Sequence, residues 1–138
     1  MFEHCLYFNT TALARLLDRE WARAFAPFEL TPSQGFMLRA VLAQPGLLQR
    51  ELATILVIAR ATATRSLDGL ASKDLIERRA SPADARESMI FPTRQAQAIR
   101  QDLNDASGEV TARLKKQLGA DQFAQAVGHL GAIRRGIG

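Results

Sequence analysis

The sequence predicts a mainly α-helical protein with one short β-hairpin. Along most of the chain, apolar residues recur at three- and four-residue steps, which is the period of amphipathic helices. The exception is a polar loop over residues 81–88, flanked by two short runs, 76–80 and 89–91, that suit antiparallel strands. Hydrophobic residues make up 47% of the 138 residues, so we expect a single domain, residues 1–138, with a buried core.

Two helices are predicted in the first third of the chain. The first runs from Cys5 to about Phe25. The second follows Thr31, which suits an N-cap, while Pro32 takes the first helical position and Gln34 completes a capping box. The Pro-Gly pair at 45–46 is expected to end the second helix, because neither residue continues a helix well.

Two shorter helices are predicted over residues 47–56 and 59–75. The residues expected on the outer face of the second are Thr62, Thr64, Arg65 and Ser66. Two short helices joined by a tight turn, the second with a polar and cationic face, form a helix-turn-helix. The hairpin follows directly, so the predicted fold is a winged helix-turn-helix with the hairpin as its wing. The apolar residues expected to face the core from the second, third and fourth helices are Phe36, Met37, Ala40, Val41, Leu48, Leu52, Ile55, Ala63, Leu67, Leu70 and Ala71.

A long helix from Thr93 to about Leu118, and a last helix from Asp121 to about Arg135, complete the prediction. The long helix spans roughly 38 Å, which is more than a winged helix can cover. Its apolar residues form a heptad-like stripe: Ala96, Ile99, Leu103, Ala106, Val110 and Leu114. The stripe and the terminal helices therefore need a partner surface, and a symmetric homodimer is the simplest source.

These predictions divide the chain by role. Residues 29–93 form the winged helix-turn-helix core, and residues 1–28 and 94–138 form N- and C-terminal dimerisation helices. The net charge of +4 and the isoelectric point of about 10.0 permit nucleic-acid binding without proving it.

The chain contains one cysteine, Cys5, so no intrachain disulfide can form and a reducing compartment fits best. No signal-peptide pattern and no apolar stretch of membrane-spanning length occur, so we expect a cytoplasmic protein that does not enter a membrane. The only soft candidate metal ligands, His4, Cys5 and His129, lack a clustered spacing, so no metal is expected. No phosphate loop or nucleophile motif points to catalysis, so neither an enzyme nor a cofactor is predicted.

Several short motifs occur in a set order along the chain. They are LTPSQ, opening the second helix, ELA in the third, TATRSLDGLASKDLIERR across the fourth helix and first strand, and DAR in the wing. Their order and spacing resemble the MarR family of bacterial transcriptional regulators. The resemblance covers nearly the whole chain. It implies a winged helix-turn-helix homodimer that binds palindromic operator DNA, usually as a repressor relieved by a small ligand or by thiol oxidation. The chain departs from the family at caps and joints, with Asp74, Ala96 and Leu48 in place of the usual Gly, Gly and Ser or Thr.

The fourth helix supplies the first candidate site residues. Those expected to meet the DNA major groove are Arg60, Thr62, Thr64 and Arg65. Arginine can contact guanine through two hydrogen bonds, and threonine can contact phosphate or a thymine methyl group. Gln49 and Arg50, near the start of the third helix, are candidate phosphate contacts. The alternative interpretation is an ordinary solvated helix face.

The wing supplies the second group of candidates. By resemblance, Arg86 enters the minor groove, where narrow A·T-rich stretches concentrate negative potential. Asp84 would repel DNA, so its expected role is to hold the loop or the arginine by a charge-assisted hydrogen bond. The alternative is a solvated hairpin turn, because Pro, Asp and Ser are common turn residues.

Cys5 and Trp21 are candidates for a redox or effector site. The peroxide-sensing branch of the family has a cysteine near the start of its first helix, supported by tyrosines, one of them in the second helix. Residues 31–43 contain no tyrosine, and Tyr7 is the only one in the chain. A buried structural cysteine is therefore favoured over a sensor. Trp21 is expected in the core or dimer interface, and the resemblance also places it near an effector pocket between the first, second and fifth helices.

Together, these features favour a dimeric DNA-binding transcriptional regulator, a repressor released by a small ligand. Two alternatives stay open. One is a thiol-based redox-sensing repressor that uses Cys5. The other is a winged-helix protein-interaction module that does not bind DNA.

Overall fold

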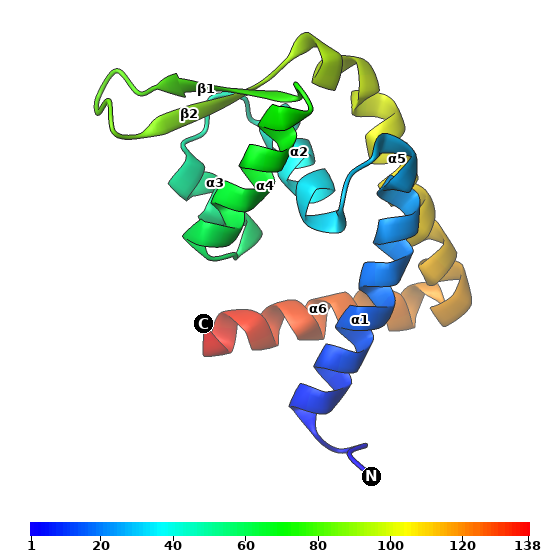
Figure 1. Cartoon of the computed structure of the whole chain (residues 1–138). Helices are drawn as coiled ribbons and strands as arrows, with labels where there is room; N and C mark the ends of the chain where they lie inside the picture. Colours follow the sequence, from blue (N-terminus) through cyan, green and yellow to red (C-terminus); the bar gives the residue numbers. More distant parts are fainter.

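The structure, a computed structural model, describes all 138 residues and is mainly helical. Its elements are α1 (Leu6–Phe25), the 3₁₀ helix η1 (Ala26–Phe28), α2 (Pro32–Ala43), α3 (Gln49–Leu56), α4 (Arg60–Ser72), β1 (Ile76–Ala80), β2 (Ser88–Pro92), α5 (Arg94–Leu118) and α6 (Ala120–Ile137). Figure 1 shows α2, α3, α4 and the hairpin gathered in one lobe, from which α1 and α5 run away together and α6 crosses beneath. The winged helix-turn-helix prediction is confirmed.

Side-chain caps fix where α2 and α5 begin. The Thr31 hydroxyl accepts a hydrogen bond from the Gln34 backbone N–H, and the Gln34 side chain accepts one from the Thr31 N–H, so the predicted capping box is present. Thr93 caps α5 by accepting from the Ala96 N–H, and its hydroxyl also donates to the Asp74 carbonyl at 2.7 Å. This last bond ties the start of α5 to the end of α4.

The hydrophobic core lies where α2, α4, β2 and α5 meet. Phe25 from α1, Leu38 from α2 and Leu103 from α5 are fully buried in it. Most predicted inward residues of α2, α3 and α4 are buried or half-buried, but Phe36, Ile55 and Ala71 are exposed. The predicted outward position of Ser66 was also wrong, because the serine lies on the inner stripe of α4 with Ala63, Leu67 and Leu70.

The wing is an antiparallel pair whose register runs from Ile76 opposite Pro92 to Ala80 opposite Ser88. The first strand matches the prediction, and the second is one residue longer at each end. A third segment, residues 46–48, was not predicted. It pairs with β2 through Gly46 N–H to the Ile90 carbonyl at 2.8 Å and Ile90 N–H to the Leu47 carbonyl at 2.9 Å. This pairing anchors the base of the wing to the start of α3.

The structure corrects the expectation that the apolar stripe of α5 needs a second chain to cover it. Ala96, Leu103 and Val110 of its apolar stripe are buried within the same chain, because α1 and α2 pack against this face. By contrast, no residue of α6 is buried. The large apolar side chains exposed on α6 are Val127, Leu130, Ile133 and Ile137, and those exposed before and along α1 are Met1, Phe2, Leu6, Tyr7, Phe8, Leu13 and Leu16. No helix combines the length and apolarity needed to cross a membrane.

Candidate nucleic-acid interface

The candidate residues of α4 form a connected polar surface with the start of α3. The Gln49 amide donates to the Thr64 hydroxyl at 2.8 Å, and this hydroxyl donates to the Arg60 carbonyl at 3.0 Å. The Arg65 guanidinium donates to the Thr62 hydroxyl at 3.2 Å. Arg60, Thr64 and Arg65 are exposed, whereas Thr62 and Gln49 are half-buried. α4 thus presents the Arg60 and Arg65 guanidinium groups and the Thr64 hydroxyl outward, with the Gln49 amide of α3 beside them.

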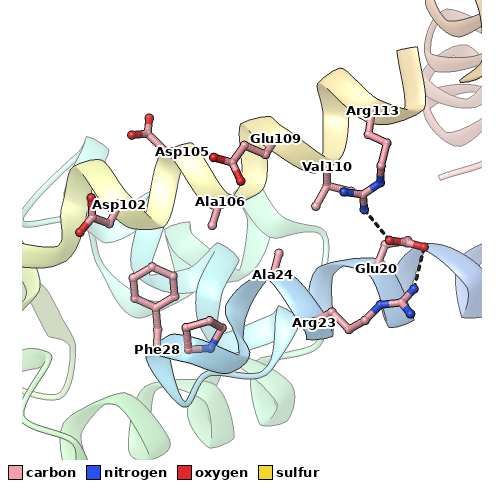
Figure 2. A pocket seen from close by; sticks show the side chains of 11 residues that line it. Glu20, Arg23, Ala24, Phe28, Asp102, Asp105, Ala106, Glu109, Val110 and Arg113 are labelled. Carbon is pink, nitrogen blue, oxygen red and sulfur yellow. Dashed lines mark hydrogen bonds and ion pairs between the residues drawn. The ribbon is translucent and has the colours of Figure 1, made fainter. Parts of the chain in front are cut away.

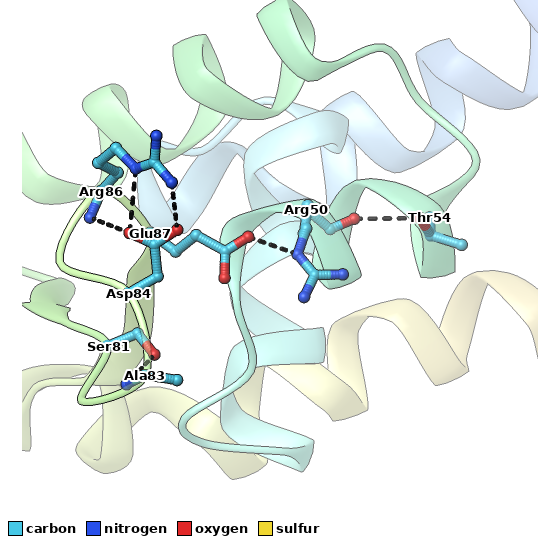
Figure 3. A network of polar contacts seen from close by, with 7 residues as sticks. All are labelled: Arg50, Thr54, Ser81, Ala83, Asp84, Arg86 and Glu87. Carbon is cyan, nitrogen blue, oxygen red and sulfur yellow. Dashed lines mark hydrogen bonds and ion pairs between the residues drawn. The ribbon is translucent and has the colours of Figure 1, made fainter.

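The wing loop holds Arg86 against Asp84 (Figure 3). The Arg86 backbone N–H and Nε both donate to Asp84 Oδ1, at 3.0 and 3.2 Å, and Nη2 donates to Oδ2 at 3.2 Å. These bonds, first from the side chain and then from the backbone, hold the pKa of Asp84 below its usual value. The carboxylate therefore stays ionised, and the pair intact, to lower pH than an unpaired aspartate would allow. The Arg86 side chain is 90% exposed, so it is oriented but free to meet a partner.

Arg50 of α3 reaches across to the wing. Its Nε lies 2.7 Å from Glu87 Oε1 (Figure 3). Arg50, Arg60, Arg86 and Glu87 also line one pocket of about 250 Å³ between α3, α4 and the wing. Candidates that lie far apart in the sequence are thus brought together on one surface.

Two arginines of β1, which sequence reasoning missed, lie at the start of the wing, and each is paired with a carboxylate. Arg78 donates to Asp68 of α4 at 2.7 Å, and Arg79 lies over the Phe91 ring at 4.1 Å and donates to Glu77 at 3.2 Å. The available signal was the Arg-Arg pair within a strand that leads into the wing. Glu87 was also missed, because a carboxylate was not considered as a partner for Arg50.

Cys5 does not fit the expected buried structural cysteine. It is exposed, because the first ten residues of the chain lie outside the core. Its Sγ accepts from the Phe8 backbone N–H at 3.5 Å and caps the start of α1. The structure therefore gives Cys5 a capping role and leaves its thiol accessible in the single chain.

Trp21 belongs to a polar junction in which the Ser107 hydroxyl links α1, α2 and α5. Its Nε1 donates to Ser107 Oγ of α5 at 3.0 Å, and Arg39 Nη1 of α2 donates to the same oxygen at 3.0 Å. Arg39 Nε also donates to Asn104 at 2.8 Å. Burial lowers the pKa of Arg39 below its usual value, and no carboxylate pairs with it. Trp21 is thus a structural junction as well as an effector-site candidate.

Two hollows occupy the region of the expected effector pocket. A groove of about 790 Å³ lies between α1 and α5, where Glu20 accepts from Arg23 at 2.7 Å and from Arg113 at 2.6 Å (Figure 2). Trp21 does not line this groove. It lines a separate hollow of about 350 Å³ between α1 and α2, together with Leu17 and Phe36. No group of three or more His, Cys, Asp or Glu side chains is placed to hold a metal ion.

The central segment of the chain matches a family model described as the MarR family, over residues 28–87. This segment is therefore similar to MarR-family proteins. This segment begins before α2 and ends at the wing loop, so it covers the helix-turn-helix, β1 and the wing loop but not β2. The MarR resemblance seen in the sequence is confirmed.

Solved structures extend the likeness to the flanking helices. The transcriptional repressor CouR, bound to a 23-mer DNA duplex, is 28% identical with a TM-score of 0.82, covering 96% of this chain and 94% of that one. MarR from E. coli in its apo form is 25% identical with a TM-score of 0.72, covering 93% and 95%. A probable transcriptional regulator from Pseudomonas aeruginosa has a TM-score of 0.88 at 19% identity, covering 96% and 99%, and it supports the fold alone. Curated protein sequences gave no significant match. The chain has the fold of MarR-family transcriptional regulators.

Proposed function

We propose that this protein is a sequence-specific DNA-binding transcriptional regulator that represses its target genes and is released by a small ligand. The observation that carries the proposal is the single surface formed by the outward face of α4, the start of α3 and Arg86 of the wing. A MarR-family segment spans this surface, and the similar repressor CouR is bound to a DNA duplex. Such a regulator acts in the cytoplasm, where operator DNA is found.

The proposed roles of the residues are assigned from their positions on this surface. α4 enters the major groove, where Arg60 and Arg65 contact base edges or phosphates and Thr62 and Thr64 contact phosphate or thymine methyl groups. Gln49 and Arg50 contact the phosphate backbone from α3. Arg86, oriented by Asp84, enters the adjacent minor groove.

The proposed active form is a homodimer. An 18-residue helix with no buried residue has little to hold it in a single chain, so the apolar face of α6 fits a second copy. In this arrangement residues 29–93 bind DNA, and residues 1–28 and 94–138 join the two copies. The dimer sets the spacing of two α4 helices on a palindromic operator.

Release by a ligand is supported by the groove between α1 and α5. It lies beside the helix that connects the wing to α6, so a bound molecule could change the distance between the two α4 helices. The groove is lined by both charged and apolar side chains, including Glu20, Arg113 and Phe28. The hollow beside Trp21 is the second candidate.

The first alternative is a redox-sensing repressor, favoured by the exposure of the Cys5 thiol. In that case peroxide should release DNA from the wild type, while Cys5→Ser should bind with equal affinity and ignore peroxide. We expect little specific effect of peroxide, because α2 has no tyrosine to support a thiolate. Gel-shift titrations of both proteins, with and without peroxide, separate the two outcomes.

The test of the main proposal is selection of bound fragments from genomic or random DNA, followed by a salt titration on the selected duplex. A regulator with phosphate contacts gives a steep decrease in affinity with salt. If no duplex is enriched and binding is absent at low salt, the alternative of a protein-interaction module replaces the proposal.

A further inference from the structure

The pocket between α3, α4 and the wing contains more cations than anions. Three guanidinium groups line it, from Arg50, Arg60 and Arg86, against one carboxylate, that of Glu87. Arg86 is already held by Asp84, and the Arg60 guanidinium has no hydrogen-bond or ion-pair partner. Glu87 thus occupies a place that would suit an external anion.

The contact of Glu87 with Arg50 is close but exposed. The Nε to Oε1 distance is 2.7 Å, and the two side chains are 56% and 32% exposed for Arg50 and Glu87 (Figure 3). Exposed ion pairs contribute little to stability, because water and salt screen them. A DNA phosphate is tetrahedral, but its two non-bridging oxygens offer arginine a pair of anionic acceptors, as a carboxylate does. Phosphate can therefore take over this contact without disturbing the fold.

We propose that Glu87 is an internal competitor of DNA: its carboxylate mimics a backbone phosphate beside Arg50 and lowers the affinity of the protein for its operator. This inference rests on the proposed DNA-binding function. In the free protein the charge of Arg50 is neutralised, and an approaching phosphate also meets the negative charge of Glu87. When DNA binds, Arg50 must exchange the Glu87 carboxylate for a phosphate. The contact therefore contributes less to affinity than the same contact made by an unpaired arginine.

The wing does not need this ion pair to keep its shape. The Ser81 N–H donates to the Glu87 carbonyl at 2.9 Å, and the Glu87 N–H donates to the Asp84 carbonyl at 3.0 Å. Both bonds use backbone atoms, so they survive a change of the side chain. The base of the wing is held independently by the bonds between β2 and residues 46–48.

The test compares Glu87→Gln with the wild type on the selected operator duplex at several salt concentrations. Glutamine has the same size but no charge. The variant is expected to bind about three- to tenfold more tightly at low salt, with the salt slope steeper by about one unit, because Arg50 then acts as a full counterion. Glu51→Gln is the matched control, since it removes a charge next to Arg50 from a side chain that forms no ion pair with it.

A double-mutant cycle with Arg50→Gln isolates the effect of Glu87 on the contact between Arg50 and phosphate. Glu87→Gln should give little gain in the Arg50→Gln background. The inference is overturned if Glu87→Gln weakens binding, which would mean that the ion pair positions the wing. It is also overturned if Glu51→Gln gives an equal gain, or if the gain persists without Arg50, because both results would reflect overall charge alone. Failure of wild type and Glu87→Gln to bind any duplex would instead remove the proposed function itself, and this inference with it.

Discussion

Individual arginines on the proposed DNA-binding surface differ in the hydrogen bonds that they make within the protein. Arg65 contacts only a neighbouring hydroxyl on α4, whereas Arg86 is bound by both oxygens of Asp84. A side chain on a rigid helix can read a base edge, because its position relative to the groove is fixed. A side chain on a loop, oriented by a carboxylate, suits a groove potential or a phosphate. Replacing the two residues should therefore affect DNA binding differently: one change should reduce sequence discrimination and the other should reduce overall affinity.

Arg65→Ala should reduce discrimination between operator and random duplexes. Losing one good base contact costs about 1–3 kcal/mol at that base pair, while binding to random DNA changes less. Binding isotherms on both duplexes measure the ratio. Arg19→Ala, which removes an exposed arginine from α1, should leave the ratio unchanged. An Arg65→Ala protein with wild-type discrimination would mean that this face of α4 does not read bases.

Arg86→Ala should weaken operator and random DNA together and lower the salt slope by about one unit, with some additional loss on A·T-rich flanks. The variant also leaves the Asp84 carboxylate without its partner, and that charge repels DNA. Asp84→Asn combined with Arg86→Ala should therefore recover part of the loss. The same salt titrations provide the measurement, and unchanged affinity in the single variant would contradict a DNA contact by the wing.

At the scale of elements, local signals and most of the inward-facing residues were predicted correctly, whereas contacts between distant segments were not. The capping box at Thr31 and the strand at 76–80 depend on neighbouring residues, and both matched. The strand-like segment at 46–48 was missed because three residues are too few to show the alternation of apolar and polar residues that indicates a strand. Phe36 was placed inside because it fits the helix period, yet its ring packs beside Trp21 and Phe25 at the edge of the core and stays 38% exposed. Similarly, the exposure of Cys5 and the Arg50–Glu87 pair depend on how distant segments meet, which a sequence pattern does not encode.

The turn between α3 and α4 contains a residue in an unfavourable conformation. Val57 has φ 55° and ψ 51°, in the left-handed region that β-branched residues avoid. That conformation costs an L-residue about 1–2 kcal/mol, whereas glycine adopts it readily at an entropic cost of about 0.5–1 kcal/mol. The Val57 side chain is 60% exposed, so its removal loses little burial.

Val57→Gly should therefore raise the free energy of unfolding, by about 0.5–1 kcal/mol, the difference between the two costs. Urea unfolding at a fixed protein concentration measures it. Val57→Ala keeps a Cβ atom and should not give the same gain. A Val57→Gly protein less stable than the wild type would show that the turn gains more from packing of the valine than it loses in backbone strain.

For the whole molecule, the proposed DNA-binding core and flanking helices do not pack as separate units. Phe25 of α1 and Leu103 of α5 belong to the same hydrophobic core as α2 and α4. The Ser107 hydroxyl accepts hydrogen bonds from Trp21 and Arg39, so it links α1, α2 and α5 in one polar junction. A displacement of α1 or α5 would therefore move α2 and the lobe attached to it. What remains outside this single body is α6, joined to it mainly through α5.

α6 is where a second copy should be required. Its Leu130 and Val127 side chains are exposed at 42% and 57% in the single chain, and Ile133 continues the same stripe. Leu130→Asp would be tolerated on a monomer surface, because an exposed aspartate costs little there. In a dimer interface the carboxylate would be buried without a partner, which strongly disfavours association.

Leu130→Asp should therefore lower the dimer fraction in light scattering while helix content in circular dichroism stays near that of the wild type. Removal of residues 119–138 should give a monomer or an aggregate. Gln125→Asp, which places the same charge away from the apolar stripe, should remain dimeric. Because a palindromic operator needs two α4 helices at once, operator affinity should decrease with the dimer fraction. A Leu130→Asp protein that stays dimeric, or a truncated chain that is a well-folded dimer, would locate the interface elsewhere, on α1 or α5.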